Sequence, residues 1–401
     1  MTAIRAGIIS LHTSPLTQAG SGDSGGMNVY IREFVSSLTQ AGVQCDVFVR
    51  RWRDDLEPIV EVEPGFRVIH VPAGAVDLAK EDLPSVVDEF SAWMLEWLET
   101  NPVDVLHANY WLSGVAGHHL AHQLDLPLVT TFHTLARVKA EMGDSEPQAR
   151  IDAEAMVVAF SDVMIANADV ERNQLIELYE ADPELVEIVA PGVDRAFFSP
   201  GSQQGARTAI DYSGGPLVLF VGRIQPLKGV DVAVEALAKL TNTDARLLIV
   251  GGASGRDGAD EVAKLEALIS ELGIEDRVVF VPPQPHYALS TYYRAADVVV
   301  MPSRSESFGL VALEAAACGI PVVAAAVGGL RTLVRDGQTG YLIDGRDPAD
   351  YAKAIDSILA SSDRAAAFGA AGAAVASRYP WSGLAGRLRT IYQRLIDERR
   401  S

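Results

Sequence analysis

The feature that most constrains the fold is a repeated alternation of short apolar runs with longer amphipathic segments. Runs of this kind, separated by helical segments, are typical of parallel strands that are covered by helices on both faces of a sheet. We expect strands at residues 4–11, 45–49, 66–71, 105–107, 128–132, 163–166 and 186–189, and again at 217–221, 247–250, 278–281, 298–301, 321–325 and 341–343. The sequence therefore predicts an α/β protein built from doubly wound, Rossmann-like sheets.

The length of the chain and one break in the pattern indicate two domains. A chain of 401 residues is longer than one ordinary core requires. The alternation stops at residues 191–215, which are rich in Gly, Pro, Ser and Gln and are typical of a linker. We predict an N-terminal Rossmann-like domain at 1–197 and a second at 198–378. An amphipathic helix at 379–401 is expected to cross back onto the N-terminal domain.

Charge and cysteine content narrow the class of partner and the compartment. The chain has 33 basic and 53 acidic residues, a net charge of −20, which argues against nucleic acid and anionic membranes as general partners. Cys45 and Cys318 lie in apolar contexts and are expected to be buried, reduced thiols. With neither a signal-peptide pattern nor a membrane-span pattern, we expect a soluble cytoplasmic protein acting on small molecules, with a homodimer left open.

A glycine turn near the N-terminus is the first candidate half of a binding site. Gly22-Asp23-Ser24-Gly25-Gly26-Met27-Asn28 follows the first expected strand and opens an amphipathic helix. Gly25 and Gly26 would let the backbone approach a diphosphate closely. The turn is not a G-x-G-x-x-G fingerprint, and Arg50 rather than an acidic residue stands at the end of the second expected strand, which disfavours a nicotinamide cofactor.

The other candidate half lies in the second half of the chain. Arg223 and Lys228 follow the first strand expected there, at the end where open α/β sheets bind ligands. Glu306 and Glu314 flank the start of a helix expected at 311–318, whose free amides near Gly309 would attract an anion. On spacing alone these residues are also consistent with ordinary surface charges. Neither half is a complete site, so a cleft between the two domains is implied.

Three motifs resemble those of a known enzyme family. They are G-R-I-x-P-x-K-G at 222–229, P-S-x-x-E-S-F-G-L-x-x-x-E-A at 302–315, and G-G at 328–329. Together they are similar to the retaining glycosyltransferases of GT-B architecture, which use nucleotide sugars. The resemblance covers essentially the whole chain.

The resemblance assigns roles to residues of the donor side. Arg223 and Lys228 would bind and neutralise the donor diphosphate, with the backbone at Gly309 and Leu310. Gly26 would approach the diphosphate from the other domain. Glu314 would hold the ribose and Gln284 would lie at the uracil. Glu306 and His133 would contact the transferred sugar, so that the resemblance names His133, Arg223, Lys228 and Glu306 as the catalytic residues.

The acceptor side is most similar to the actinobacterial branch of the family that glycosylates an inositol phosphate. Lys80, Tyr110, Thr134 and Arg150 match its phosphate-binding set, and His12, Asp23 and Asn28 match groups that orient the inositol ring. Two cations and two hydroxyls would make a sensible phosphate cradle. Taken singly, each of the four is also consistent with a structural role, such as a surface lysine for Lys80 or a core tyrosine for Tyr110.

The resemblance therefore implies transfer of N-acetylglucosamine from UDP-N-acetylglucosamine to 1D-myo-inositol 3-phosphate, the first step of mycothiol synthesis. It implies no metal site and no cofactor for the chemistry. One alternative is a related transferase with another phosphorylated acceptor, of the sucrose-phosphate synthase type. Another is a UDP-sugar 2-epimerase of the same architecture. A catalytically inactive sugar-nucleotide binder is disfavoured, because no expected charged group is missing.

Overall fold

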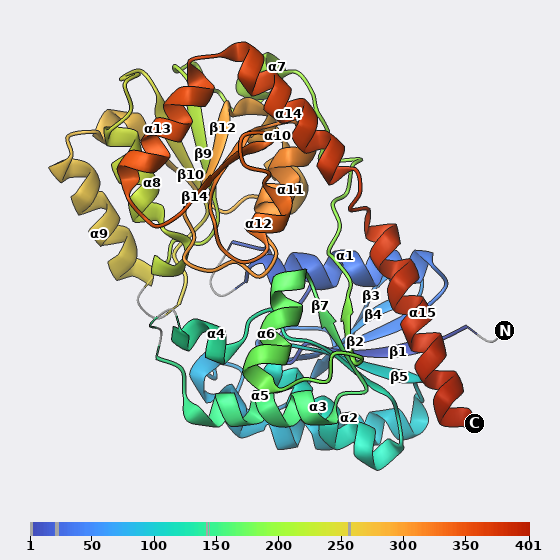
Figure 1. Cartoon of the computed structure of the whole chain (residues 1–401). Helices are drawn as coiled ribbons and strands as arrows, with labels where there is room; N and C mark the ends of the chain where they lie inside the picture. Colours follow the sequence, from blue (N-terminus) through green and yellow to red (C-terminus); the bar gives the residue numbers. More distant parts are fainter. Residues whose placement is uncertain (1–2, 21–23, 142, 144, 256–257) are drawn as a thin grey trace. The chain divides into compact units, whose positions relative to one another are not determined.

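The computed structural model describes residues 3–20, 24–141, 143, 145–255 and 258–401. The chain forms two compact units. The first comprises Met1–Thr17, Tyr30–Pro191 and Trp381–Ser401, and the second comprises Gln18–Val29 and Gly192–Pro380. Each unit is an α/β layer structure with helices on both faces of one sheet (Figure 1).

The sheet of the first unit has eight strands in the order β3-β4-β2-β1-β5-β6-β7-β8. All neighbouring pairs are parallel except β3 with β4. The strand order reverses between β1 and β5, so loops that follow these two strands diverge and leave room for a ligand. The strands are β1 (Arg5–Ile9), β2 (Gln44–Arg50), β3 (Ile59–Glu63), β4 (Phe66–Val71), β5 (Val105–Asn109), β6 (Leu128–Thr131), β7 (Val163–Ala166) and β8 (Val186–Ile188).

Side chains of β5 show how both faces of this sheet are covered. Leu106 and Ala108 pack in one apolar cluster with Met94 and Leu112 of the helices on that face. His107 points the opposite way, as alternation along a strand requires, and its ring lies 5.5 Å from that of Phe34 on the other face. The helices of this unit are α1 (Gly26–Gln40, from Tyr30 onward), η1 (Lys80–Val86), α2 (Val87–Thr100), α3 (Trp111–Leu124), α4 (Ala136–Glu141), α5 (Gln148–Phe160), α6 (Asp169–Tyr179) and α15 (Trp381–Arg400).

The C-terminal helix α15 belongs to the first unit. Its buried residues include Leu384, Leu388 and Leu395, which form one stripe at helical spacing. Tyr392 lies on the same side and places its hydroxyl 2.6 Å from Nδ1 of His107. The apolar stripe and this buried hydrogen bond together attach the end of the chain to β5.

The sheet of the second unit has six parallel strands in the order β11-β10-β9-β12-β13-β14. Its strand order reverses between β9 and β12, which makes the loops after these strands the expected ligand-binding edge. The strands are β9 (Leu217–Val221), β10 (Arg246–Val250), β11 (Val278–Val281), β12 (Val298–Met301), β13 (Val322–Ala325) and β14 (Gly340–Ile343).

The helices of the second unit enclose a core rich in β-branched residues. Val218, Ile249 and Val300 of the sheet pack with Leu237 and Ile355 of the covering helices. The helices are α7 (Gln203–Ala209), η2 (Pro226–Lys228), α8 (Val230–Ala238), α9 (Gly258–Glu271), η3 (Glu275–Arg277), η4 (His286–Ala288), α10 (Leu289–Ala295), α11 (Leu310–Ala317), α12 (Leu330–Leu333), α13 (Pro348–Leu359) and α14 (Ser362–Ala376).

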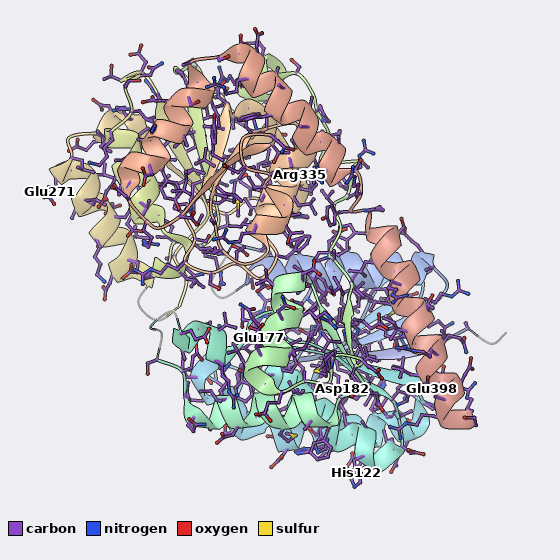
Figure 2. The ribbon with its side chains drawn as sticks, viewed as in Figure 1. His122, Glu177, Asp182, Glu271, Arg335 and Glu398 are labelled. Atoms are coloured by element: carbon purple, nitrogen blue, oxygen red, sulfur yellow. The ribbon has the colours of Figure 1, made fainter. Side chains whose placement is uncertain are left out.

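The surplus of acidic residues includes side chains that face solvent. Figure 2 shows Glu271 of α9 and Glu398 of α15 pointing away from their own units, and both are exposed. In the part of the chain that the structure describes, no helix is both long enough and apolar enough to span a bilayer.

The α/β prediction is confirmed, and each expected strand is present. Cys45 and Cys318 are buried free thiols, as predicted. Two elements depart from the predicted pattern of strands and linker. The edge strand β3 alternates apolar and acidic residues from Val60 to Glu63 and pairs antiparallel with β4, so it lacks the continuous apolar run of a strand covered on both faces. Helix α7 lies inside the predicted linker.

Candidate functional site

Arg223 is positioned by two loops that touch at the carboxyl ends of β9 and β10. A Cβ atom on Gly251 would lie 1.9 Å from the carbonyl oxygen of Gly222, so only glycine permits this approach. The amide of Ile224 donates to the carbonyl of Gly252 at 2.9 Å. Arg223 Nη1 then donates to the hydroxyl of buried Ser254 at 3.2 Å. The structure thus places Arg223 at the sheet edge that the sequence predicted.

Lys228 and Glu306 form an ion pair across the reversal between β9 and β12. Lys228 Nζ lies 2.6 Å from Glu306 Oε2, and both side chains are largely buried. Their loops are held together by the amide of Arg304, which donates to the carbonyl of Leu227 at 2.8 Å. Gly229 has φ of 68°, and a Cβ there would lie 2.1 Å from the carbonyl oxygen of Pro302. This glycine is therefore required for the two loops to meet.

The G-G motif supports the Glu306 loop from its other side. The amide of Gly329 donates to the carbonyl of Glu306 at 3.0 Å. A Cβ on Gly328 would lie 1.9 Å from the same carbonyl oxygen. Gly309, at φ of 102°, ends the loop, and α11 begins at Leu310. The first amides of a helix have no intrahelical acceptor, so this end can receive an anion.

Glu314 lies one turn into α11 and is buried with both carboxylate oxygens occupied. Oε1 lies 2.7 Å from His286 Nε2, and Oε2 accepts from the hydroxyl of Tyr293 at 2.8 Å. Burial and the neighbouring Glu314 carboxylate raise the pKa of Tyr293 well above its usual value, so Tyr293 remains a donor. A carboxylate has about four lone-pair sites, which leaves acceptor capacity on Glu314.

Gln284 lies close to this group along the chain, two residues before His286. Its side-chain amide donates to the carbonyl of Pro282 at 2.8 Å, within the Pro-rich turn that precedes η4. The side chain is therefore used to hold the turn, which leaves the backbone of this segment for a ligand.

The N-terminal glycine turn belongs to the second unit. A Cβ on Gly25 would lie 3.1 Å from Arg223 Nε, and one on Gly26 would lie 3.8 Å from Leu310. The side-chain oxygen of Asn28 accepts from the amide of Gly25 at 2.9 Å, so Asn28 stabilises the turn. The turn therefore lies beside Arg223 and Leu310, two residues of the predicted donor site. Asp23 lies outside the described residues.

In the first unit, three residues of the predicted phosphate-binding set lie together. Nη2 of Arg150 donates to Thr134 Oγ1 at 3.2 Å, and its guanidinium lies 5.2 Å from the centroid of the Tyr110 ring. His12, which follows β1, packs its ring 4.3 Å from that of Tyr110. These residues follow β1, β5 and β6 or lie on α5, around the reversal of the strand order. The contacts described for this cluster do not include Lys80, which is exposed at the start of η1.

The expectation of two cations and two hydroxyls omits the carboxylates of this cluster. Nε of Arg150 donates to Glu154 Oε1 and Nη1 donates to Glu146 Oε2, both at 2.8 Å. Glu146 also accepts from Lys139 Nζ at 2.9 Å. Burial opposes the charge on Arg150, but Tyr110 and the two glutamates raise its pKa overall, so the guanidinium remains charged.

Two candidate residues have strained backbones. Tyr110 and His133 have φ of 77° and 63°, which side-chain-bearing residues rarely adopt. Among the described residues, Asp125, Glu180 and Asp211 share this feature, and the first two are ordinary helix C-caps. Strain of this kind persists where the surrounding structure enforces it and is concentrated at functional sites. Both strained residues lie in the loops after β5 and β6, which also carry the other candidate residue Thr134.

His133 is partly buried, and its imidazole is neutral. Its Nε2 lies 3.0 Å from Oδ1 of Asn109, and because a carbonyl oxygen only accepts, the proton is on Nε2. Burial lowers the pKa of His133 to about 3. The ring cannot therefore act as a cation near neutral pH. It can orient a neutral hydroxyl or backbone group.

Two histidines with lowered pKa values, His107 and His133, predict acid sensitivity of folding. Burial lowers the pKa of His107 and of His133 from 6.5 to about 3, so the unfolded state binds protons first and stability falls as pH drops from 6.5. Burial raises the pKa of Glu171 to about 7, which stabilises the folded state as pH falls from 7 to 4.5 and offsets one histidine there. We expect a net loss of about 1.4 kcal/mol per pH unit from 6.5 to 4.5 and about twice that below.

Urea unfolding at pH 7, 6, 5 and 4 measures this slope. Replacing His107 with glutamine removes one titrating group and should flatten the dependence below pH 6.5 by about 1.4 kcal/mol per unit. An unchanged slope in His107→Gln would mean that His107 is not buried in the neutral form.

Several polar residues of these clusters could not be found by motif. Ser254, His286, Tyr293 and Asn109 each contact a predicted residue that lies 21 or more residues away in sequence. Tertiary packing alone brings them together. Among the described residues, no group of three or more His, Cys, Asp or Glu side chains could hold a metal ion.

Two family models match the chain, and they divide it near its middle. The model described as "Glycosyltransferase Family 4" matches residues 24–197. The model described as "Glycosyl transferases group 1" matches residues 203–375.

Relatives and solved structures cover nearly the whole chain. A protein of Xylanimonas cellulosilytica named D-inositol 3-phosphate glycosyltransferase is 45% identical, over 98% of both chains. A protein of Acidothermus cellulolyticus with the same name is 44% identical, over 100% of this chain and 92% of its own. The sucrose-phosphate synthase of Thermosynechococcus elongatus has a similar structure, with a TM-score of 0.93 and 31% identity over 98% of this chain and 100% of its own.

Proposed function

The chain belongs to the family of D-inositol 3-phosphate glycosyltransferases, and we propose that it transfers N-acetylglucosamine from UDP-N-acetylglucosamine to 1D-myo-inositol 3-phosphate. The fold and the family make it a glycosyltransferase of GT-B architecture. The donor, the acceptor, retention of configuration and a place at the start of mycothiol synthesis are parts of the proposal.

On the donor side, we assign the diphosphate to Arg223 and Lys228 together with the first amides of α11. This arrangement supports the assignment because both cations lie at the sheet edge where the strand order reverses. Glu306 uses one carboxylate oxygen on Lys228 and keeps acceptor capacity for a sugar hydroxyl. Glu314 is assigned to the ribose and the backbone near Gln284 to the uracil.

On the acceptor side, we assign the phosphate to Lys80, Tyr110, Thr134 and Arg150, and the inositol ring to His12, Asp23 and Asn28. The observation that carries the proposal is the contact of one guanidinium, that of Arg150, with both Thr134 and Tyr110. The family resemblance named these residues from three separate segments, and they lie together in the folded first unit. Such a group of one buried cation and two hydroxyls suits a phosphate.

The proposed reaction requires no covalent enzyme intermediate. The acceptor hydroxyl attacks the anomeric carbon from the face that UDP leaves, the bond between that carbon and the UDP oxygen breaks, and a donor phosphate oxygen takes the hydroxyl proton. Arg223, Lys228 and the α11 amides stabilise the charge that develops on the departing diphosphate. His133, neutral and held by Asn109, orients the transferred sugar.

Two alternatives are tested by one acceptor screen. The similarity to sucrose-phosphate synthase favours an acceptor such as fructose 6-phosphate as the second candidate, although identity to the inositol-named relatives is higher. A UDP-sugar 2-epimerase would release UDP without any acceptor. We expect UDP release from UDP-N-acetylglucosamine to require inositol 3-phosphate. Equal release with fructose 6-phosphate, or without acceptor, would favour the alternatives.

We also propose that the chemistry needs no metal ion. Two cations, Arg223 and Lys228, are available to neutralise the diphosphate, and the sequence has no Asp-x-Asp motif for a divalent ion. Activity should therefore survive exhaustive treatment with EDTA, measured as UDP release before and after dialysis. Complete loss that Mg²⁺ or Mn²⁺ restores would contradict this part of the proposal.

We expect the enzyme to act in the cytoplasm on small-molecule substrates, with no nucleic-acid or membrane partner. The net charge of −20 supports the absence of nucleic-acid and anionic-membrane partners, because it repels polyanions. The local cations Arg223, Lys228 and Arg150 then select phosphorylated ligands against that background.

A further inference from the structure

Arg150 has few hydrogen-bond donors left for a substrate. Its guanidinium has five N–H groups. Nε donates to Glu154, Nη1 donates to Glu146, and Nη2 donates to the hydroxyl of Thr134 at 3.2 Å and to its carbonyl at 3.4 Å. The side chain is only 7% exposed. A phosphate that binds Arg150 in the bidentate manner must therefore displace one of the present partners.

The two glutamates are not equally easy to displace. Glu154 is fully buried and is held by three donors, which are Arg150, the amide of Ala136 at 2.8 Å and the hydroxyl of Tyr179. Glu146 lies in the connection between α4 and α5, next to the N-cap Pro147, and its described partners are the two cations Arg150 and Lys139. Removing a carboxylate from both cations costs little when a phosphate takes the same two places. Glu146 is therefore the partner that can leave.

Lys139 shares this anion with Arg150. Its Nζ lies 2.9 Å from Glu146 Oε1, and Arg150 Nη1 lies 2.8 Å from Oε2 of the same carboxylate. Lys139 is on α4, one helical turn after Leu135 and close in sequence to Thr134. Lys139 and Arg150 lie on neighbouring helices and hold one carboxylate between them. This is the geometry of an anion site that the protein's own side chain already occupies.

We propose that Lys139 is a further ligand of the acceptor phosphate and that Glu146 is the resident carboxylate that the phosphate displaces. This inference rests on the proposed function, since it concerns the same acceptor site. Glu146 then competes with the acceptor phosphate for the two cations. A phosphate dianion can replace Glu146 on both Lys139 and Arg150, whereas an acceptor without a phosphate leaves Glu146 in place.

Titration with inorganic phosphate, without donor or acceptor, tests the site directly. Isothermal titration calorimetry on the full chain should show that Glu146→Gln binds phosphate about tenfold more tightly than wild type, because the neutral amide competes poorly for the cations. Lys139→Gln should bind phosphate about tenfold more weakly. Asp152→Asn on the exposed face of α5, the helix that carries Arg150, is the matched control and should not change the affinity; Asp152 contacts Gln148.

The sign of the Glu146 effect separates this role from a structural one. If Glu146 only holds Arg150 in place, Glu146→Gln weakens phosphate binding, and the inference is wrong. It is also wrong if both variants bind phosphate as wild type does. Thermal denaturation confirms that the variants are folded; should Glu146→Gln fail to fold, the affinity of Lys139→Gln decides.

Kinetics with the proposed acceptor separate a failure of this inference from a failure of the proposed function. We expect Glu146→Gln to lower the KM for inositol 3-phosphate and to leave that for unphosphorylated inositol nearly unchanged. Phosphate affinities that shift as expected in a protein without inositol 3-phosphate-dependent transfer would support the anion site and contradict the function. Transfer that occurs with unshifted phosphate affinities would support the function and contradict the anion site.

Discussion

Replacing Lys228 with alanine should lower kcat by about 10²–10³-fold, the range for removal of one preorganised group that stabilises charge in the transition state. Lys228 is held at the reversal of the strand order by its ion pair with Glu306, and η2 and Gly229 fix its backbone. The position of this loop depends little on packing of the Lys228 side chain, so we expect Lys228→Ala to fold normally. UDP release under saturating substrates measures the effect.

Two controls make the Lys228 result interpretable. Lys239→Ala removes an exposed lysine at the C-terminus of α8 in the same unit and should leave kcat unchanged. Because Lys228→Ala also leaves Glu306 without its partner, thermal denaturation of both variants must show that the folded fraction is equal. A folded Lys228→Ala enzyme with wild-type turnover would contradict the assignment of Lys228 to the diphosphate.

Replacing Lys80 with alanine should raise the KM for inositol 3-phosphate by about tenfold to hundredfold, because one charged contact contributes about 1.5–3 kcal/mol. Lys80 is a better probe than Arg150. It is exposed, whereas removing Arg150 would leave the buried Glu154 carboxylate without its cation and destabilise the fold. Affinity for UDP-N-acetylglucosamine without acceptor should barely change, which calorimetry can verify.

A double-mutant cycle shows whether Lys80 touches the phosphate. The cycle combines Lys80→Ala with loss of the phosphate from the acceptor, by using unphosphorylated inositol. If Lys80 contacts the phosphate, loss of the phosphate lowers the rate of transfer less in Lys80→Ala than in wild type. The variant then discriminates less between inositol 3-phosphate and inositol. Additive costs would mean that Lys80 does not contact the phosphate.

Placement of the donor-side residues could be predicted because it follows from sheet topology. Arg223, Lys228 and Glu306 come shortly after apolar runs that are recognisable as buried strands, and carboxyl ends of parallel strands meet at one edge. The structure also explains why glycine stands at two positions of the motifs. Gly229 and Gly328 stand where a Cβ would collide with a backbone carbonyl of a neighbouring loop.

The electrostatic partners could not be predicted, because they depend on packing between distant segments. Tyr293 meets Glu314 from another helix, and nothing in their spacing indicates it. Glu146 and Glu154 do lie four residues either side of Arg150, the spacing of helical ion pairs, but the same spacing occurs on solvated helix faces. The sequence thus indicated a cradle of cations and hydroxyls, and the structure adds the two carboxylates that balance it.

The most direct test of the central claim is the identity and anomeric configuration of the product formed from UDP-N-acetylglucosamine and inositol 3-phosphate. Nuclear magnetic resonance of the purified product should show N-acetylglucosamine joined to inositol phosphate with the α configuration of the donor. A β-linked product would contradict retention. Free sugar or an epimerised sugar nucleotide, formed equally without the acceptor, would contradict the transferase account itself.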